Sequence, residues 1–318
     1  MISINEKAVK IVKKIIAGKQ KLDVNVYEVN SSTIIDCGVK SKGSIKAGLL
    51  VGEICMGGLA EINVFKNTSF ENNLFIKVQS DKPVIACLGS QYAGWRIKLN
   101  DFYALGSGPA RAISRVEKEL YNRINYKDDY FKSVIFLETS MIPKPKVVKY
   151  ISDACRVDAG NMYILIARTS SLVGSVQIAS RVLETAIHRL MHLDFPLNRI
   201  VAGEGVCPIP PVAKSDQHAM GVTNDAIIMM GDVTLTVEGL EDEFIKAGVE
   251  SMVSTSSPGF GKPFIEILEE AAYDFYKINP SIFSPAKITI VNRDSGHSFQ
   301  SGWLNWEAYK KTIAKYVP

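Results

Sequence analysis

Two short, largely apolar segments flank an amphipathic one in the middle of the chain, and this order constrains the fold more than any other feature. SVIFLE (133–138) and MYILIA (162–167) are typical of buried strands, whereas PKVVKYISDACRV between them is typical of a helix. Two strands joined by a helix of this length lie parallel in one sheet, because the helix carries the chain back to the starting edge. The segment therefore predicts a βαβ unit.

The rest of the chain alternates in the same manner. Residues 5–19 predict an amphipathic helix, and further helices are expected from Pro83, over 175–190, over 263–272 and at WLNWEAYKK. The pair AIIMM and VTLTVEG, separated by a glycine, indicates a hairpin. We expect an α/β (mixed α+β) fold with mixed sheets, not a single doubly wound parallel sheet. The remaining predicted strands are DVNVYEV, STIIDCGV, WRIKL, DFYAL and KITIV.

The length of the chain predicts two domains. It has 318 residues, 47% of them apolar, and a domain usually takes ~100 to 200 residues. Pro143 and Pro145 stand before the middle helix, and proline favours loops and first helical turns. We therefore expect domains at 1–142 and 143–318, with a ligand cleft between them and with the chain free to cross more than once.

Composition argues against several classes of protein. The 37 basic and 33 acidic residues give a net charge of +4 without a basic block, so nucleic acid is not an expected partner. No apolar run reaches the ~18 residues of a membrane span, and the amino terminus lacks a signal-peptide pattern. The five cysteines are scattered and predict neither a disulfide framework nor a zinc site. These features favour a cytoplasmic protein.

The stretch SVQIASRVLETAIHRL (175–190) contains a candidate catalytic pair. On a helical wheel its apolar residues form one stripe, and Arg181 and Glu184 lie opposite that stripe. One interpretation is a solvated face with an ordinary i,i+3 ion pair, which is worth ~0.2 to 0.5 kcal/mol. The other is that the pair lines a cleft, where Arg181 keeps Glu184 ionised and orients it as a base.

Three further segments contain candidate binding residues, each with a structural alternative. LGSGPARA (105–112) can cradle an anion with its backbone N–H groups and Ser107, or can form a plain tight turn. SQYAGWR (90–96) and GVTNDAI (221–227) offer side chains that suit a hydrogen-bonding heterocycle, but an aromatic core and an Asx turn explain them equally well. The candidates in these two segments are Gln91, Tyr92, Asn224 and Asp225.

Histidine supplies no convincing metal site. His188 and His192 lie four residues apart on the predicted helix, which is a possible spacing for two ligands. No third ligand accompanies them in a known pattern, so we predict no bound metal and expect these histidines at the surface or at an interface.

Nine motifs follow one another along the chain: IDCGV, GLLVGEICMGGLA, QYAGW, LGSGPARA, VGSVQIASRVLET, PIPPVA, MGVTNDAI, GFGKPF and YDFYKINP. In this order they resemble the motifs of one family. The chain is similar to methenyltetrahydromethanopterin cyclohydrolases over nearly its whole length. That resemblance implies an archaeal-type one-carbon enzyme of methanogenesis, a hydrolase of a C–N bond in a cyclic amidine, with two domains and the pterin between them. It also implies a homotrimer with no metal and no tightly bound cofactor, the tetrahydromethanopterin derivative being the substrate.

The resemblance also assigns roles to residues. The R-x-x-E of the family matches Arg181 and Glu184, which implies that Glu184 is the base and that Arg181 tunes it. The Q-x-A of the family matches Gln91, Tyr92 and Ala93; some relatives carry lysine at the middle position, so a backbone role is implied for Tyr92. The residues placed near the ligand because they would line the expected cleft are Ser107, Gly108, Asn224 and Asp225.

Two other functions fit parts of the sequence. A non-catalytic pterin- or nucleotide-binding protein would share the pocket, but it has no need of the Arg181–Glu184 pair. An oxidoreductase would require a dinucleotide-binding loop, and LGSGPARA lacks the third glycine and the following acidic residue of that fingerprint. The sequence therefore favours the cyclohydrolase, which interconverts methenyl-tetrahydromethanopterin and water with N5-formyl-tetrahydromethanopterin.

Overall fold

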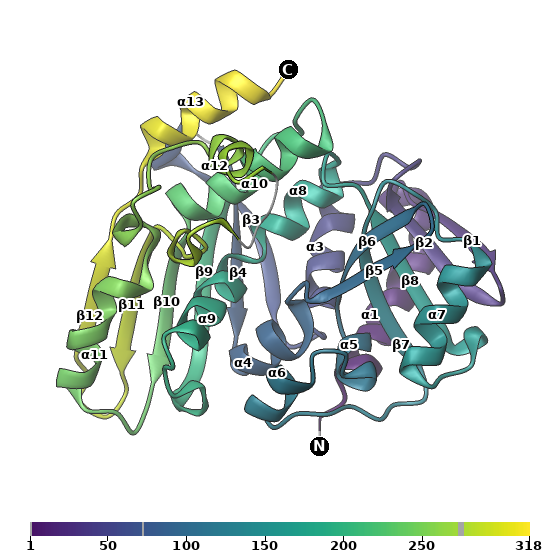
Figure 1. The fold of residues 1–318 in the computed structure, drawn as a ribbon, viewed down its shortest axis with the longest axis horizontal. Coiled ribbons are helices and arrows are strands. Elements are labelled where there is room, and N and C mark those ends of the chain that lie inside the picture. The colour runs from purple at the N-terminus through teal and green to yellow at the C-terminus, as the bar shows by residue number, and fades with distance from the viewer. Residues whose placement is uncertain (1, 72, 273–276) are drawn as a thin grey trace. The chain divides into compact units, whose positions relative to one another are not determined.

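The computed structural model describes residues 2–71, 73–272 and 277–318, which form two compact units (Figure 1). The first unit contains residues 1–61 and 85–177, and the second contains residues 62–84 and 178–318. Each unit is built around one six-stranded sheet that has both parallel and antiparallel neighbours. The expected mixed α/β fold is confirmed.

The sheet of the first unit contains the predicted βαβ motif. β7 and β8 are parallel, with Ser133 opposite Met162, and helix α7 (Pro145–Cys155) joins them. β2 pairs with β8 in the same direction, whereas β1, β6 and β5 are antiparallel to their neighbours. In spatial order the strands are β1 (Asn25–Val29), β2 (Ser32–Gly38), β8 (Met162–Ala167), β7 (Ser133–Glu138), β6 (Phe102–Ser107) and β5 (Trp95–Leu99).

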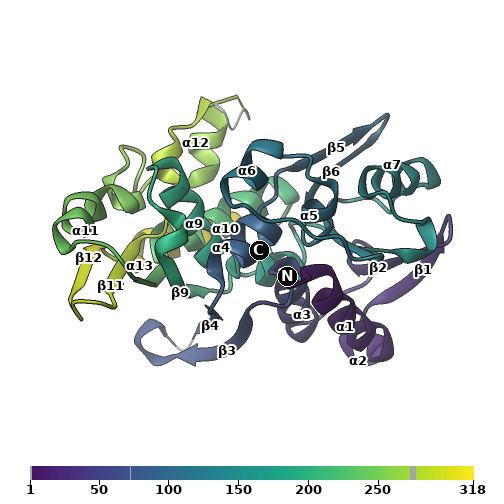
Figure 2. The ribbon, with the colours of Figure 1, turned by 90° about the horizontal axis from the view of Figure 1, so that it is seen from below.

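Both faces of this sheet are covered by helices, which explains why consecutive residues in the middle of β7 and β8 are apolar. On β7, Val134 and Phe136 pack with α1 (Ile4–Ala17) and α3 (Ile45–Cys55). The alternate residues Ile135 and Leu137 pack on the other face with α7 and α5 (Ala110–Ser114). Figure 2 shows α1 and α3 on one side of the strands and α7 on the other.

The two units do not follow the domain division expected from the sequence. Pro145 is the first residue of α7, and this helix is the crossover between β7 and β8. The prolines therefore mark a helix start inside the first unit, which continues to residue 177. Residues 62–84 belong to the second unit because β4 pairs with β9 there.

The sheet of the second unit has one buried face. On β10, Val233, Leu235 and Val237 are buried, whereas the intervening Thr234 and Thr236 are partly exposed. Helices α9 (Val182–His192), α11 (Asp242–Gly248) and α12 (Phe264–Glu270) lie on one side of the sheet (Figure 2). In spatial order the strands are β12 (Ser298–Gly302), β11 (Lys287–Asn292), β10 (Asp232–Val237), β9 (Ile200–Pro208), β4 (Asn73–Ser80) and β3 (Glu61–Asn67).

The predicted strand AIIMM is wrong, and so is the hairpin with the strand that follows. These residues are the last five of helix α10 (Asp216–Met230), all of them buried. A fully buried helix end is apolar on every side, so its residues show no periodicity that would distinguish it from a buried strand. The other helices are α2 (Lys19–Leu22), α4 (Pro83–Ala86), α6 (Lys118–Arg123), α8 (Leu172–Ala179) and α13 (Trp306–Tyr316).

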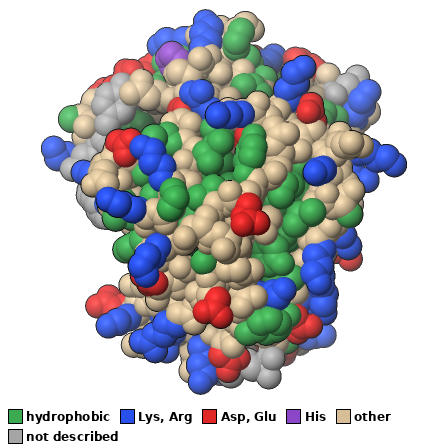
Figure 3. All heavy atoms as spheres, turned by 90° about the vertical axis from the view of Figure 1, so that its right-hand side faces the viewer, with side chains coloured by type: hydrophobic (Ala, Val, Ile, Leu, Met, Phe, Trp, Pro, Cys, Tyr) green, Lys and Arg blue, Asp and Glu red, His purple; other side chains and the backbone are tan. Residues whose placement is uncertain are grey.

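The surface charge is mixed. On the face shown in Figure 3, lysine and arginine side chains surround apolar patches, and aspartate and glutamate side chains lie among them. Within the described parts of the chain, no helix combines the length and the apolar character that crossing a membrane requires.

A buried carboxylate, that of Asp36, lies near the end of strand β2. Asp36 is fully buried, and its Oδ1 accepts hydrogen bonds from the backbone N–H groups of Gly38 and Val39 at 3.1 and 2.7 Å. Its Oδ2 accepts from the N–H groups of Lys40 and Ser41 at 2.9 and 3.2 Å. This accounts for the acid in the IDCGV motif, because one buried carboxylate satisfies four backbone donors of the turn that follows.

We predict that Asp36→Asn lowers the free energy of unfolding by about 1 to 3 kcal/mol, because the amide replaces one acceptor with a donor and leaves backbone N–H groups of the turn without their acceptor. Urea unfolding of the purified variant measures the change. Asp153→Asn is the control, since Asp153 is 61% exposed and pairs only across a helix turn with Lys149. Equal stability of the two variants would contradict this account of the turn.

Candidate active site

The helix expected over 175–190 is interrupted just before Glu184. Helix α8 ends at Ala179, and α9 begins at Val182 with Arg181 as its N-cap residue. Glu184 consequently lies in the first turn of α9. The amino end of a helix carries a partial positive charge, which stabilises an ionised carboxylate at this position.

Arg181 and Glu184 form an ion pair away from bulk water. Nη1 of Arg181 lies 3.6 Å from Oε2 of Glu184, and the side chains are only 13% and 8% exposed. The interpretation of a solvated helix face is therefore wrong. A guanidinium beside a buried carboxyl group favours the ionised form, which is the form a general base requires.

Two glycines of strand β9 fix the start of α9. A Cβ atom on Gly203 would lie 2.8 Å from Cδ1 of Leu183, and one on Gly205 would lie 2.7 Å from Cγ1 of Val182. Val182 and Leu183 are both fully buried at this contact. Because the helix rests directly on the strand backbone, the residue that follows, Glu184, has a fixed position.

The histidines of α9 lie one and two turns beyond Glu184. The rings of His188 and His192 meet edge to face with centroids 4.6 Å apart. Burial lowers the pKa of His188 to about 4, and the neighbouring His192 and Arg181 contribute to the lowering, so the imidazole is neutral near pH 7. Among the residues that the structure describes, no cluster of three or more His, Cys, Asp or Glu side chains has a geometry suited to a metal ion.

The segment Gln91–Tyr92–Ala93 belongs to the first unit. The helix predicted from Pro83 continues as a π-helical turn, Cys87–Gln91, and the backbone leaves it at Tyr92 with φ −48° and ψ 136°. Gln91 is fully buried, whereas Tyr92 and Ala93 are partly exposed. The Tyr92 ring lies against the guanidinium of Arg111, 5.2 Å from ring centroid to Cζ.

Ser107 and Gly108 lie at the end of β6, beside this segment. Ser107 is 2% exposed, and its Oγ lies 3.6 Å from Sγ of Cys55. Gly108 has φ +101°, and its N–H donates to the Ser90 carbonyl at 2.8 Å. This N–H group therefore already has a partner within the protein. Of the two alternatives for LGSGPARA, an anion-binding loop and a tight turn, the geometry at Gly108 matches the tight turn.

Asn224 and Asp225 lie in the second unit, inside helix α10, so the expected Asx turn is wrong. The Asn224 amide donates to the Met220 carbonyl of its own helix at 2.8 Å. Asp225 is fully buried, and its Oδ1 accepts from the backbone N–H of Phe264 at 2.9 Å, at the start of α12. This hydrogen bond thus connects the GVTNDAI motif to the GFGKPF motif.

The candidates fall into two groups by unit. Arg181 and Glu184 belong to the second unit, as do Asn224 and Asp225, whereas the other five candidates belong to the first. Sequence analysis missed Arg111, although LGSGPARA contains it; this side chain is fully buried and pairs with Glu117, with Nε 2.8 Å from Oε1. Residues 273–276 of the YDFYKINP motif lie outside the described residues.

Comparison with known proteins agrees with the motifs. A family model described as Cyclohydrolase (MCH) matches residues 3–313. The chain belongs to the methenyltetrahydromethanopterin cyclohydrolase family. Curated cyclohydrolases of this name from Methanocella arvoryzae and Methanothermobacter marburgensis are 44% and 40% identical to it. The alignments cover 96% and 98% of this chain and 96% and 99% of the relatives. The cyclohydrolase of Methanocaldococcus jannaschii is 37% identical, over 98% of each chain.

We predict that Gly205→Ala lowers the free energy of unfolding by about 1 to 3 kcal/mol, because the added methyl group displaces Val182 and the start of α9. Turnover falls with it, since Glu184 moves with the helix. Urea unfolding and initial rates measure both effects. Gly248→Ala is the control, because its Cβ would meet only the flexible end of Met252 at 3.4 Å. A Gly205→Ala protein with wild-type stability and activity would show that the contact between Gly205 and Val182 does not fix the start of α9.

We predict that Asp225 makes the protein less stable as the pH rises from about 4 to about 8. Burial raises the pKa of this carboxyl group from 3.8 to about 8, so between these values the folded state keeps a proton that the unfolded state has released. Asp225→Asn should therefore gain stability relative to the wild type between pH 5 and pH 8, measured by urea unfolding. The exposed Asp129 supplies the control, Asp129→Asn. A pH-independent difference for Asp225→Asn would refute the prediction.

Proposed function

We propose that this protein interconverts methenyl-tetrahydromethanopterin and water with N5-formyl-tetrahydromethanopterin. The observation that carries the proposal is the Arg181–Glu184 pair, withdrawn from bulk water at the amino end of α9. Family membership over residues 3–313 supports the choice of substrate, because the curated relatives are methenyltetrahydromethanopterin cyclohydrolases.

The chemistry of the substrate matches a site built on one carboxylate. The methenyl carbon bridges two nitrogens in an amidinium-like cation and is already electrophilic. It therefore needs no Lewis acid to accept a nucleophile. We propose that the reaction uses no metal and no bound cofactor, and that its main requirement is a base for the attacking water.

In the proposed reaction, Glu184 takes a proton from water as the water oxygen bonds to the methenyl carbon. The product of this step is a neutral tetrahedral carbon bearing a hydroxyl group and both nitrogens. Protonation by Glu184 of the nitrogen that leaves then allows its bond to carbon to break, the electron pair staying on nitrogen. The hydroxyl group loses its proton and becomes the formyl carbonyl, so one proton is released overall.

Arg181 holds Glu184 in the ionised state and orients it. A cation so close also limits the basicity of the carboxylate, so the separation of 3.6 Å suits a base that must both accept and return a proton. The guanidinium also allows Glu184 to stay ionised although it is buried, since a buried carboxyl group without a cationic partner would be protonated.

The remaining expectations complete the proposal. We propose that the pterin-binding group consists of Gln91, Tyr92, Ala93, Ser107, Gly108, Asn224 and Asp225. The buried Asp225 would act through the Phe264 backbone that it binds. We also propose a homotrimer located in the cytoplasm, where the five free, buried cysteines would stay reduced. A non-catalytic pterin-binding protein is the alternative, and the Arg181–Glu184 pair argues against it.

We predict that Glu184→Gln lowers kcat by about 10² to 10⁴-fold with little change in KM, because the amide cannot accept the proton of water. The loss of the methenyl chromophore in solution follows the reaction directly. Glu238→Gln is the control, since Glu238 is 46% exposed and pairs with Arg293 on the surface. Full activity of Glu184→Gln would rule out this residue as the base.

We predict that removing metals leaves the rate unchanged. Wild-type protein treated with a chelator, dialysed and assayed by the same loss of absorbance should retain its kcat, because water activation is assigned to Glu184 alone. A rate that falls on chelation and recovers on addition of a divalent metal would overturn the metal-free mechanism.

A further inference from the structure

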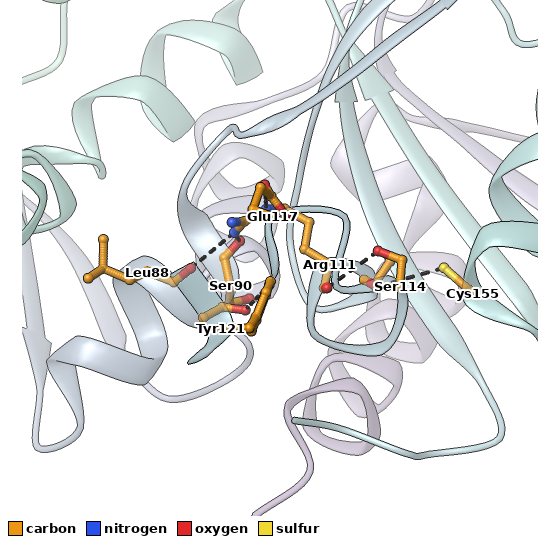
Figure 4. A network of polar contacts seen from close by, with 9 residues as sticks. Leu88, Ser90, Arg111, Ser114, Glu117, Tyr121 and Cys155 are labelled. Carbon is orange, nitrogen blue, oxygen red and sulfur yellow. Dashed lines mark hydrogen bonds and ion pairs between the residues drawn. The ribbon is translucent and has the colours of Figure 1, made fainter. Parts of the chain in front are cut away.

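Three successive backbone carbonyls just before Gln91 are bound by side chains from another part of the first unit. Nη1 of Arg111 donates to the carbonyls of Leu88 and Ser90 at 3.2 and 2.9 Å. The hydroxyl of Tyr121 donates to the carbonyl between them, that of Gly89, at 3.0 Å. Figure 4 shows Arg111, Tyr121 and Glu117 gathered around this turn.

These carbonyls need such partners because of the backbone they belong to. They lie in the π-helical turn Cys87–Gln91, and the chain leaves the helix at Tyr92. Carbonyls at the end of a helix have no partner within it. π-Helical turns are also frequent at functional sites, where they place side chains that a regular helix would not. Arg111 and Tyr121, together with the Gly108 N–H that also donates to the Ser90 carbonyl, bind the turn from which the Gln91–Ala93 segment begins.

The Arg111 side chain is held through its Nε and Nη1 atoms. It is fully buried, and its Nε donates to Oε1 of Glu117 at 2.8 Å. Its Cζ lies 5.2 Å from the centroid of the Tyr92 ring and 5.7 Å from that of Tyr121. A buried cation is costly unless it is paired and hydrogen-bonded, and this one has a carboxylate, two carbonyls and two aromatic rings.

The network also encloses the far end of the segment. A Cβ atom on Gly94 would overlap Oε1 of Glu117 and would lie 2.6 Å from Cε1 of Tyr92. Only glycine therefore allows both groups to close over the backbone there. The same carboxylate that pairs with Arg111 thus packs against the residue that follows Ala93, and the segment is fixed at both ends.

We propose that Arg111 is a positioning residue for pterin binding, acting through the Leu88 and Ser90 carbonyls on Gln91, Tyr92 and Ala93. This inference rests on the proposed function only for the role of that segment. Lysine cannot replace Arg111, because the guanidinium binds the carboxylate and the two carbonyls through two separate nitrogens, whereas the three donors of an ammonium all belong to one nitrogen. The Tyr92 ring, packed on Arg111, contributes by holding the backbone in place.

The inference predicts a distinct kinetic signature. Glu184 belongs to the second unit, whereas Arg111 and the turn that it binds belong to the first, so the chemical step should keep its rate and its pH profile. Substrate binding should weaken equally in the ground state and the transition state. Such a loss raises KM and leaves kcat unchanged.

The experiment compares Arg111→Lys with Arg115→Lys, a nearby arginine whose Nη2 binds the Asn122 side chain and not the turn. For Arg111→Lys we expect KM for methenyl-tetrahydromethanopterin to rise about tenfold or more, with kcat and its pH profile as in the wild type. Arg115→Lys should keep the wild-type KM. Tyr121→Phe, which removes one of the three carbonyl contacts, should raise KM by a smaller factor and provides the test if Arg111→Lys does not fold.

Direct binding separates this inference from the proposed function. The dissociation constant for the methenyl compound, measured in a Glu184→Gln background, should rise when Arg111→Lys or Tyr121→Phe is added. The dissociation constant should rise in this way even if turnover depends on a base other than Glu184. An unchanged dissociation constant and KM in both variants, with only a smaller fraction of active protein, would overturn the positioning role.

Discussion

The contact between the start of α9 and the glycines of β9 is the constraint on which the proposed chemistry depends. Gly203 and Gly205 let Val182 and Leu183 rest directly on the strand backbone. Glu184 follows them in the first helical turn, where the helix dipole and Arg181 both favour a charged carboxylate. Strand β9 thereby fixes the position of Glu184, the residue proposed to take a proton from the attacking water.

Part of this architecture was predictable from local pattern. The βαβ order around α7 was predicted from alternating strand and helix signals, and the structure confirms it. Strand β9 was missed because glycines interrupt its apolar alternation. These glycines leave room for Val182 and Leu183 at the start of α9, a contact that only the folded chain shows. The AIIMM segment was assigned wrongly because burial on all sides removes the periodicity of a helix end.

The part of the candidate site that could be predicted from the sequence consists of residues that lie close together in one segment. The spacing of Arg181 and Glu184 and the family motif indicated the pair, and the structure shows it largely buried. The side chains of Ser107 and Asp225 have internal partners that only the folded chain supplies. Arg111 was not predicted, because the carbonyls that it binds lie 21 and 23 residues earlier and are brought to it by tertiary packing.

The most direct test of the account is a crystal structure of the Glu184→Gln protein with methenyl-tetrahydromethanopterin bound. The account predicts that the substituted side chain lies within about 2.6 to 3.2 Å of a water molecule facing the methenyl carbon, with Arg181 beside it. A methenyl carbon far from this side chain, or a water held there by another residue, would contradict the assignment of Glu184 as the base.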